Sequence, residues 1–293
     1  MFSLVGFLLK HPLSGKFGFS ASFRFLRWQI KSRLISRRFV HKWIGDSSFF
    51  VRNGETGLTG NIYVGLHEFQ DMVFLLHLLR SGDLFIDIGA NSGSYTILAS
   101  SVVGANSLAI EPAPSAYARL VANIKLNQME SRVDARNVGL SSEVGQFLLT
   151  VDSDTTNHLV AGETTERTTL VDVYTADNIC SGQSPTLIKI DVEGWELEVL
   201  KGAHDTLNNQ SLLAIILEIN GSGEKLGVAD ERVLDYLLKF GFEPYHYEPF
   251  SRRLSKMNGR NFGGGNTIFI RDPELALMRI QSAERRKILR TYL

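Results

Sequence analysis

A glycine turn flanked by polar side chains is the stretch of this sequence best suited to bind a ligand. Asp87 lies within the otherwise apolar run Leu84–Ile88, and Gly89, Asn91 and Gly93 follow this run and precede a helical pattern. Glycines let the backbone turn tightly and approach a ligand closely, and such a turn holds a nucleotide-like ligand at the carboxyl end of a strand. A turn that only joins a strand to a helix has the same glycines, so this pattern alone leaves both interpretations open.

The spacing of these glycines and a downstream carboxylate narrow the class of ligand. The spacing is G-x-x-x-G, and neither the dinucleotide pattern G-x-G-x-x-G nor the phosphate loop G-x-x-x-x-G-K-[ST] occurs. Glu111 lies 24 residues after Asp87, at the end of the run Leu108–Ile110, where a carboxylate can accept hydrogen bonds from both ribose hydroxyls. A lone Glu at a strand end is usually solvated. Together, the turn and Glu111 predict an adenosine-containing cofactor without a diphosphate.

The elements that must position these residues alternate between short apolar runs and helical patterns. The runs are Leu84–Ile88, Ser107–Ile110, Val133–Val138, Leu187–Ile190 and Leu213–Ile219. Runs that are apolar throughout are typical of strands covered by helices on both faces, so the pattern predicts an α/β fold with an open, mostly parallel sheet. Glu243–Tyr247 and Asn266–Ile270 are predicted to close the sheet as a terminal antiparallel hairpin, and Phe147–Val151 and Thr169–Val173 to form extra strands.

Three blocks of the sequence resemble the FkbM-type methyltransferases. They are F-I-D-I-G-A-N-S-G-S-Y-T at 85–96, the Glu111-Pro112 step, and above all I-K-I-D-V-E-G-W-E-L-E-V-L-K-G-A at 188–203. The segment N-I-Y-V-G-L-H-E-F at 61–69 resembles one found before the cofactor turn in a branch of that family. The resemblance extends from about residue 83 to 270. It implies a Class I methyltransferase (Rossmann-like) sheet of seven strands, S-adenosylmethionine as cofactor, and methyl transfer to an oxygen of a sugar or a hydroxylated natural product.

The resemblance also assigns roles to individual residues. Asp87, Gly89, Asn91 and Gly93 would hold the methionine portion of the cofactor and Glu111 its ribose, with Asn137 to Leu140 beside the adenine. Together with the charge distribution, it leads us to expect four parts of the chain: a basic amphipathic N-terminal arm (1–45), a lead-in segment and helix (46–82), the methyltransferase domain (83–275) and a C-terminal basic helix (276–293).

Two carboxylates mark the expected position of the acceptor. Asp191 and Glu218 each end a predicted strand, so both should emerge at the edge of the sheet where the cofactor binds. Methyl transfer requires that the acceptor be aligned and lose a proton. We therefore expect Asp191, which also borders the cofactor, and Glu193 to orient or deprotonate the acceptor, followed by Glu218 and His67. Glu193 could instead cap a helix that begins near residue 194, and His67 could be an ordinary surface histidine.

A divalent metal is an open alternative at the same edge. Asp191, Glu218 and Asn220 offer oxygen ligands that suit Mg²⁺. The lysine that metal-dependent catechol-type enzymes carry three residues after the aspartate is missing, because Gly194 stands there. The metal therefore stays undetermined at this point.

The zero net charge of the 293 residues conceals a basic arm on an acidic body. Residues 1–45 hold nine Lys/Arg and no Asp/Glu, which leaves 22 basic against 31 acidic residues beyond. Between Ser20 and His41, Phe23, Leu26, Ile30 and Leu34 recur at helical spacing among basic residues, which predicts an amphipathic helix. Such a helix either contacts an anionic membrane or packs its apolar stripe on the body. We favour packing, and we do not expect nucleic-acid binding, since no reading motif accompanies the charge.

The remaining features concern location and competing functions. No apolar run approaches the roughly 18–20 residues of a membrane span, and no secretory signal is expected at Met1–Leu9. The single cysteine, Cys180, fits a reducing cytosol. We therefore expect a cytoplasmic protein, with peripheral contact at the inner membrane face as an alternative.

A nicotinamide-dependent oxidoreductase and a non-catalytic, membrane-recruited binding module are the competing functions. The glycines at 263–265 could form a mobile lid or a loose connection.

Overall fold

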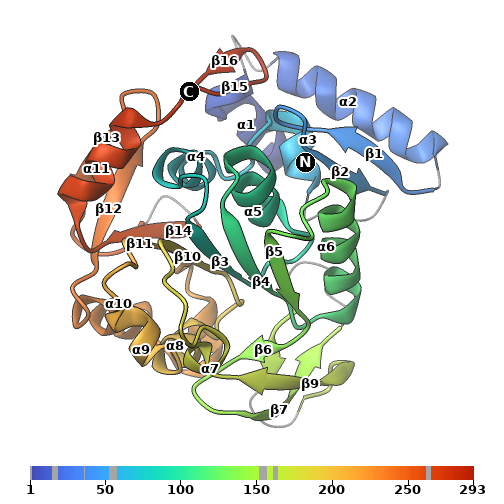
Figure 1. The fold of residues 1–293 in the computed structure, drawn as a ribbon. Coiled ribbons are helices and arrows are strands. Elements are labelled where there is room, and N and C mark those ends of the chain that lie inside the picture. The colour runs from blue at the N-terminus through green and yellow to red at the C-terminus, as the bar shows by residue number, and fades with distance from the viewer. Residues whose placement is uncertain are drawn as a thin grey trace.

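An eight-stranded sheet with the order β13-β12-β14-β11-β10-β3-β4-β5 forms the centre of the protein (Figure 1). The computed structural model describes residues 2–14, 19–35, 37–52, 58–151, 157–160, 164–261 and 265–293. The parallel strands are β3 (Leu84–Ile88), β4 (Asn106–Ile110), β5 (Val133–Arg136), β10 (Leu187–Ile190) and β11 (Ala214–Glu218). The antiparallel edge consists of β14 (Asn266–Ile270), β12 (Glu243–Glu248) and β13 (Arg253–Lys256).

This sheet confirms the predicted mostly parallel arrangement with a terminal antiparallel hairpin. The expected hairpin strands are β12 and β14, which pair with each other. The sheet has eight strands where seven were expected, because β13 adds an outer edge beyond β12. Three of the four residues of β13 are polar and its side chains are largely exposed, so no apolar run marks it in the sequence. The glycines 263 and 264 lie outside the described residues.

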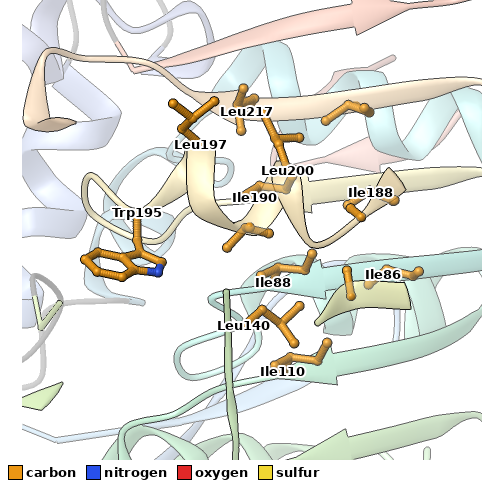
Figure 2. Packing of buried hydrophobic residues seen from close by; sticks show 14 of the residues in the cluster. Ile86, Ile88, Ile110, Leu140, Ile188, Ile190, Trp195, Leu197, Leu200 and Leu217 are labelled. Atoms are coloured by element: carbon orange, nitrogen blue, oxygen red, sulfur yellow. The ribbon is translucent and has the colours of Figure 1, made fainter. Parts of the chain in front are cut away.

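Side chains of the central strands alternate between two apolar cores, one on each face of the sheet. Figure 2 shows the first core, in which Ile86 and Ile188 of the sheet pack with Leu197 and Leu200. The helices of this core are α8 (Glu196–Lys201), α9 (His204–Asn208), α10 (Asp230–Leu238) and the short α7 (Ala176–Ile179). The second core contains α4 (Phe69–Leu78), α5 (Ser94–Ile97), the π-helical η3 (Leu98–Val103) and α11 (Pro273–Ser282). Helices therefore cover both faces, as predicted.

A second, four-stranded sheet with the order β6-β9-β7-β8 follows β5. Its strands are β6 (Gly139–Leu140), β7 (Gly145–Thr150), β8 (Leu159–Val160) and β9 (Thr168–Tyr174). The strands expected at 147–151 and 169–173 are β7 and β9, which pair antiparallel. Leu149 and Leu159 of this sheet enter the first core, so the small sheet is anchored to the large one.

The N-terminal segment differs from the expected helical arm. Its elements are α1 (Phe2–Lys10), η1 (Pro12–Ser14), α2 (Phe19–Leu34), β1 (Phe39–Lys42), β2 (Ser48–Val51) and α3 (Thr59–Val64). The helix predicted to extend to His41 ends at Leu34, and His41 lies in β1, which pairs with β2 across the expected boundary at residue 45. Aromatic and β-branched residues at 39 and 40 favour a strand, and the Phe39 ring lies 5.6 Å from that of Trp28.

The face through which α2 packs is also not the predicted one. Ala21, Trp28 and Ser32 are buried, and Ala21 and Trp28 belong to a third core that also contains residues of β2, α3 and α6 (Pro114–Leu126). The four apolar residues Phe23, Leu26, Ile30 and Leu34, expected to pack on the body, are exposed. The interpretation that this stripe is buried against the domain is therefore wrong.

The C-terminal segment is a helix followed by a hairpin, not the basic helix expected over 276–293. Asp272 caps α11 by accepting a hydrogen bond from the Leu275 N–H at 2.9 Å, and the helix ends at Ser282. Residues 287–288 and 291–292 then pair as β15 (Lys287–Ile288) and β16 (Thr291–Tyr292). The reason is burial, since Ile288 and Leu293 both belong to the second core, which a continuous exposed helix could not reach.

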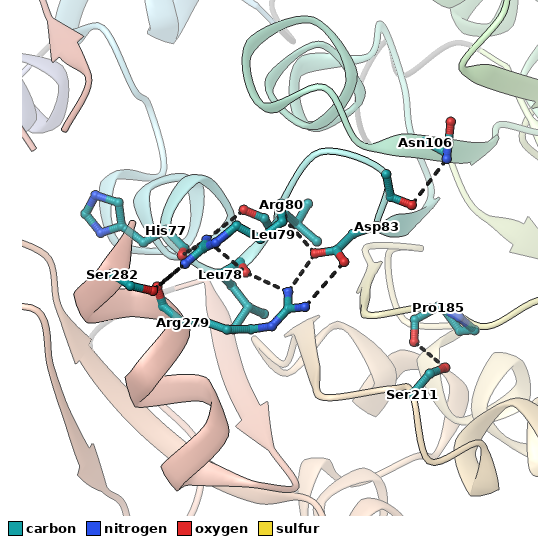
Figure 3. Close-up of polar contacts among 11 residues, drawn as sticks. His77, Leu78, Leu79, Arg80, Asp83, Asn106, Pro185, Ser211, Arg279 and Ser282 are labelled. Atoms are coloured by element: carbon teal, nitrogen blue, oxygen red, sulfur yellow. Dashed lines mark hydrogen bonds and ion pairs between the residues drawn. The ribbon is translucent and has the colours of Figure 1, made fainter. Parts of the chain in front are cut away.

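Charged side chains fasten this C-terminal segment to the loop that leads into β3 (Figure 3). Arg279 of α11 forms an ion pair with Asp83 at 2.6 Å, and Asp83 also accepts a hydrogen bond from the Arg80 N–H. The Arg80 guanidinium donates to the His77 and Leu79 carbonyls and to the Arg279 carbonyl. Residues of α4 and α11 therefore fix the start of β3, the strand that leads to the glycine turn.

Candidate active site

One cavity of about 400 Å³ opens at the carboxyl ends of the parallel strands. Most of the site residues predicted from the sequence line it: His67, Asp87, Gly89, Asn91, Glu111, Leu140, Asp191, Glu193 and Glu218. Gly93 and Asn137 are not among its lining residues. The parallel sheet thus brings together side chains that lie up to about 150 residues apart in the chain.

The turn after β3 is tied to the helix that follows it. Asp87 is buried, and one of its carboxylate oxygens accepts hydrogen bonds from the Thr96 N–H at 3.1 Å and from the Thr96 hydroxyl at 2.6 Å. Burial raises the pKa of Asp87, against the opposing effect of the nearby Lys189 ammonium. Asn91 has a φ of 50° and Gly93 a φ of 88°, so the backbone here is left-handed. Gly93 shapes the turn without touching the cavity.

The turns after β3 and β10 are in close backbone contact at Gly89. Gly89 has a φ of 80°, and a Cβ atom added there would overlap the carbonyl oxygen of Asp191. The N–H groups of Gly89 and Ala90 both donate to the Ile110 carbonyl at 3.0 Å. Only glycine satisfies both the backbone conformation and the close approach. This position therefore fixes the distance between the two halves of the cavity.

Glu111 is held by backbone groups at the end of β4. One carboxylate oxygen accepts from the Asn91 N–H at 2.7 Å and the other from the Ala113 N–H at 2.8 Å. A carboxylate has about four acceptor positions, so further donors in the cavity can still be accommodated. Burial raises the pKa of Glu111 to about 7, against the lowering effect of these N–H groups. Asn137 supports the same turn by donating to the Glu111 and Pro112 carbonyls.

A buried lysine organises the other end of the cavity. The Lys189 ammonium is buried in β10, lies 2.6 Å from an Asp191 carboxylate oxygen and sits over the Tyr95 ring at 4.8 Å. Burial alone would lower the pKa of Lys189, but the charges of Asp191, Glu68 and Asp87 outweigh it and leave that pKa raised. Burial would likewise raise the pKa of Asp191, yet the lysine holds it below its usual range. Both groups are therefore charged at neutral pH.

Glu218, at the end of β11, is the second partner of Asp191, after Lys189. Burial and the Asp191 charge raise the pKa of Glu218 well above the usual range of a carboxyl, and the two side chains are hydrogen-bonded. The protonated Glu218 is therefore the donor and Asp191 the acceptor. Glu193 lies in the turn after β10, two residues beyond Asp191. It has a φ of 55° and lines the cavity.

Glu193 is not the helix cap that its position suggested. The helix α8 begins at Glu196, and the Glu196 carboxylate accepts hydrogen bonds from the Gly194 N–H at 3.0 Å and the Val192 N–H at 3.3 Å. Glu196 is buried and its pKa is raised to about 7 by that burial. Glu196 therefore stabilises the backbone of this turn, which leaves the Glu193 side chain among the cavity residues.

His67 and Glu68, just before α4, also line the cavity, and two polar residues that do not line it, Asp71 and Asn266, lie beside Glu68. His67 is exposed at the cavity, and its ring packs edge-on against Phe7 at 5.1 Å. Glu68 lines the cavity, and Asn266 of β14 donates to both Glu68 and Asp71 at 3.1 Å. Burial, followed by the Glu68 charge, raises the pKa of Asp71 to about 7.

Sequence reasoning missed Lys189, Glu68, Asp71 and Asn266. A charged residue inside an otherwise apolar strand was the available signal for Lys189, since a buried ammonium needs a partner. Nothing in the local sequence indicated that the start of α4 and the start of β14 meet beside Lys189. That contact depends on where the antiparallel strand β14 enters the sheet.

Three carboxylates come close enough together to be considered as metal ligands. Asp191, Glu193 and Glu218 each offer an oxygen atom, and these atoms lie within 4.8 Å of one another. The predicted third ligand, Asn220, is exposed, and its amide oxygen accepts a hydrogen bond from the Ser222 N–H at 2.9 Å. The oxygen set suits Mg²⁺, but one of its members carries a proton and another is already paired with Lys189.

The strand order and the position of the cavity define a Class I methyltransferase fold of the Rossmann-like type. The sequence profile of the family described as the methyltransferase FkbM domain matches residues 87–244, which is more than half of the chain. The protein belongs to the FkbM methyltransferase family. The family resemblance predicted from residues 85–96 and 188–203 is thereby confirmed.

Two curated relatives are similar to this chain over about half of its length. The hexuronic acid methyltransferase AglP of Haloferax volcanii is 33% identical over 157 residues, which cover 52% of this chain and 62% of that protein. The methyltransferase sdnD of Sordaria araneosa is 30% identical over 172 residues, covering 47% of this chain and 66% of that protein. In both comparisons the match covers less than two thirds of the relative.

Solved structures resemble the chain more distantly. A precorrin-6y C5,15-methyltransferase from Geobacter metallireducens has a TM-score of 0.43 at 13% identity, covering 76% of this chain and 93% of that one. An rRNA methylase from Streptococcus thermophilus has a TM-score of 0.40 at 11% identity, covering 68% of this chain and 91% of that one. Because both TM-scores are low, the fold assignment rests on the strand order and the family match.

The contact at Gly89 yields a prediction with a matched control. Gly89→Ala adds a methyl group that overlaps the Asp191 carbonyl, so the two turns must separate. We expect a loss of about 3 kcal/mol or more in unfolding free energy, measured by urea denaturation. Gly182→Ala is the control, because Gly182 also has a positive φ but an added Cβ would meet no atom within 4 Å; it should cost only about 1 kcal/mol. Equal losses for the two variants would contradict the proposed close contact.

Proposed function

We propose that the protein is an S-adenosylmethionine-dependent O-methyltransferase that acts on a hydroxyl group of a glycan or another hydroxylated metabolite. The observation that carries this proposal is that Glu111 and the Lys189–Asp191–Glu218 cluster line the same cavity. Membership of the FkbM family supports methyl transfer. The similarity to a hexuronic acid methyltransferase supports an acceptor of the sugar class.

The residues of the first half of the cavity fit the cofactor. Glu111 is fixed by two backbone N–H groups and retains acceptor positions for the two ribose hydroxyls. Leu140 lines the cavity nearby and supplies an apolar surface for the adenine, while Asn137 acts through the backbone of the Glu111 turn. The turn of Gly89 and Asn91, with Asp87 behind it, would accommodate the methionine portion. When bound, S-adenosylmethionine supplies a methyl group attached to a positively charged sulfur.

The cluster around Asp191 fits the work that the acceptor requires. The Asp191 carboxylate is ionised, and its position is fixed by Lys189 on one side and by the protonated Glu218 on the other. It would accept the hydrogen bond of the acceptor hydroxyl and then its proton. An acceptor oxygen becomes much more acidic as it gains a methyl group, so even a carboxylate of lowered pKa suffices as the base. Glu193 and His67 would contact other polar groups of the acceptor.

The Lys189 ammonium stands in the cluster where a divalent metal ion would otherwise be expected. Lys189 already places a positive charge 2.6 Å from Asp191, which is the task that Mg²⁺ would perform there. We therefore propose that the carboxylates act with Lys189 and without a required divalent cation. The competing oxidoreductase function would need a diphosphate site, which the G-x-x-x-G turn does not supply.

The location of the enzyme is proposed from the N-terminal segment. Among the residues that the structure describes, no helix is long and apolar enough to cross a membrane. We propose a cytoplasmic enzyme that associates peripherally with an anionic membrane surface, through residues of α2 whose arrangement is argued in the next subsection.

The raised pKa of Glu111 predicts a pH dependence of cofactor affinity. The ionised carboxylate is the better acceptor for ribose hydroxyls, so affinity for S-adenosylmethionine should rise as pH increases through the pKa of about 7. From about pH 6 to about pH 8 the expected gain is on the order of tenfold, measured by calorimetric titration. Glu111→Gln keeps the shape but cannot ionise, so its affinity should be weaker and its dependence on pH much flatter. An identical slope in both proteins would place the ribose elsewhere.

Asp191→Asn separates catalysis from cofactor binding. The amide keeps the size of the side chain but cannot take a proton, so methyl transfer should fall by about 10²-fold or more, while S-adenosylmethionine affinity changes much less. The assay measures transfer of a labelled methyl group to a panel of hexuronic acids and neutral sugars. Each reaction is run once with added Mg²⁺ and once with a chelator, and the two rates are compared. Glu193→Gln tests the neighbouring carboxylate separately: a role limited to contacting the acceptor predicts a raised KM for the acceptor with most of kcat retained. Full activity in Asp191→Asn would refute its role as base, and a requirement for Mg²⁺ would refute the metal-free proposal.

A further inference from the structure

The helix α2 has two apolar faces, of which only one is used by the fold. Ala21 and Trp28 face the protein, while Phe23, Leu26, Ile30 and Leu34 are between 54% and 80% exposed. With successive side chains about 100° apart around a helix, the exposed set falls on one stripe opposite the buried set. The exposed stripe runs for about 17 Å along a helix about 24 Å long. Figure 1 shows α2 at the periphery of the molecule, beside α1 and β1.

Basic side chains border this exposed stripe. Arg27, Lys31 and Arg33 are all exposed, and at helical spacing Arg27 and Lys31 lie on one side of the stripe and Arg33 on the other. The first 45 residues contain nine Lys/Arg and no Asp/Glu, so no acidic residue of this segment offsets that charge. An exposed apolar stripe with basic side chains on both sides has the arrangement of a helix that lies in the interface of an anionic bilayer.

We propose that α2 docks the protein on an anionic membrane surface, with Phe23, Leu26, Ile30 and Leu34 inserted among the lipid headgroups. A second copy of the chain fits this surface less well, because pairing two such helices would bring like charges together. The helix α2 contacts an element that borders the cavity, because the Arg24 guanidinium donates to the Tyr63 carbonyl of α3 at 2.6 Å. Leu58 and Asn61, at the start of α3, line the cavity.

Flotation of the full-length protein with vesicles tests the docking surface. Vesicles of phosphatidylcholine alone are compared with vesicles that also contain phosphatidylglycerol, at low and high salt. The variant Phe23→Ser/Leu26→Ser removes two inserted side chains, and Leu275→Ser/Met278→Ser is its control, with two exposed apolar residues at the same spacing on α11. The variant Arg27→Gln/Arg33→Gln tests the charge.

The wild-type protein and the α11 control should float with the anionic vesicles, and high salt should weaken this binding. The Phe23/Leu26 variant should lose about tenfold or more in vesicle partitioning, and the Arg27/Arg33 variant should lose its preference for anionic lipid. All variants should keep their affinity for S-adenosylmethionine, so a failure of docking is distinct from a failure of the proposed function. Absence of flotation by the wild-type protein would overturn the proposal. Flotation of the Phe23/Leu26 variant at the wild-type level would also overturn it. A third contrary result would be a wild-type protein that forms a dimer, a Phe23/Leu26 variant that is monomeric, and no vesicle binding by either protein.

Discussion

The buried ammonium of Lys189 is the constraint on which the site depends. A charge in the middle of a sheet costs several kcal/mol unless carboxylates compensate it. Asp191 does so directly, at 2.6 Å, and Asp87 and Glu68 contribute through their charge. These carboxylates come from the ends of two parallel strands and from the start of α4, so the requirement to neutralise one lysine holds three elements around one cavity.

This arrangement also separates the protonation states of the carboxylates. Lys189 keeps Asp191 ionised, and the resulting negative charge helps to keep Glu218 protonated. One carboxyl group is thereby a hydrogen-bond acceptor and its neighbour a donor at the same pH. The contact of Gly89 with the Asp191 carbonyl then fixes how far this pair lies from the cofactor end of the cavity.

Much of this edge could be predicted because a parallel sheet gathers the ends of its strands. Asp87, Glu111, Asp191 and Glu218 each lie at or next to the carboxyl end of an apolar run, and all four line the cavity. Contacts made by the antiparallel strand β14 could not be predicted, since its register decides them. The periodicity of α2 likewise revealed an apolar stripe but not which side of the helix is buried, because small residues and one tryptophan form the packed face. The C-terminal hairpin is fixed by tertiary burial, which local propensity does not encode.

The proposed function requires that this cavity accept a nucleoside cofactor without a diphosphate. Calorimetric titration of the wild-type protein with S-adenosylmethionine, with its demethylated product S-adenosylhomocysteine, and with NAD and ATP tests that requirement most directly. We expect saturable binding of the first two and no measurable binding of NAD or ATP. Binding of NAD as tight as that of S-adenosylmethionine, or tighter, would contradict it.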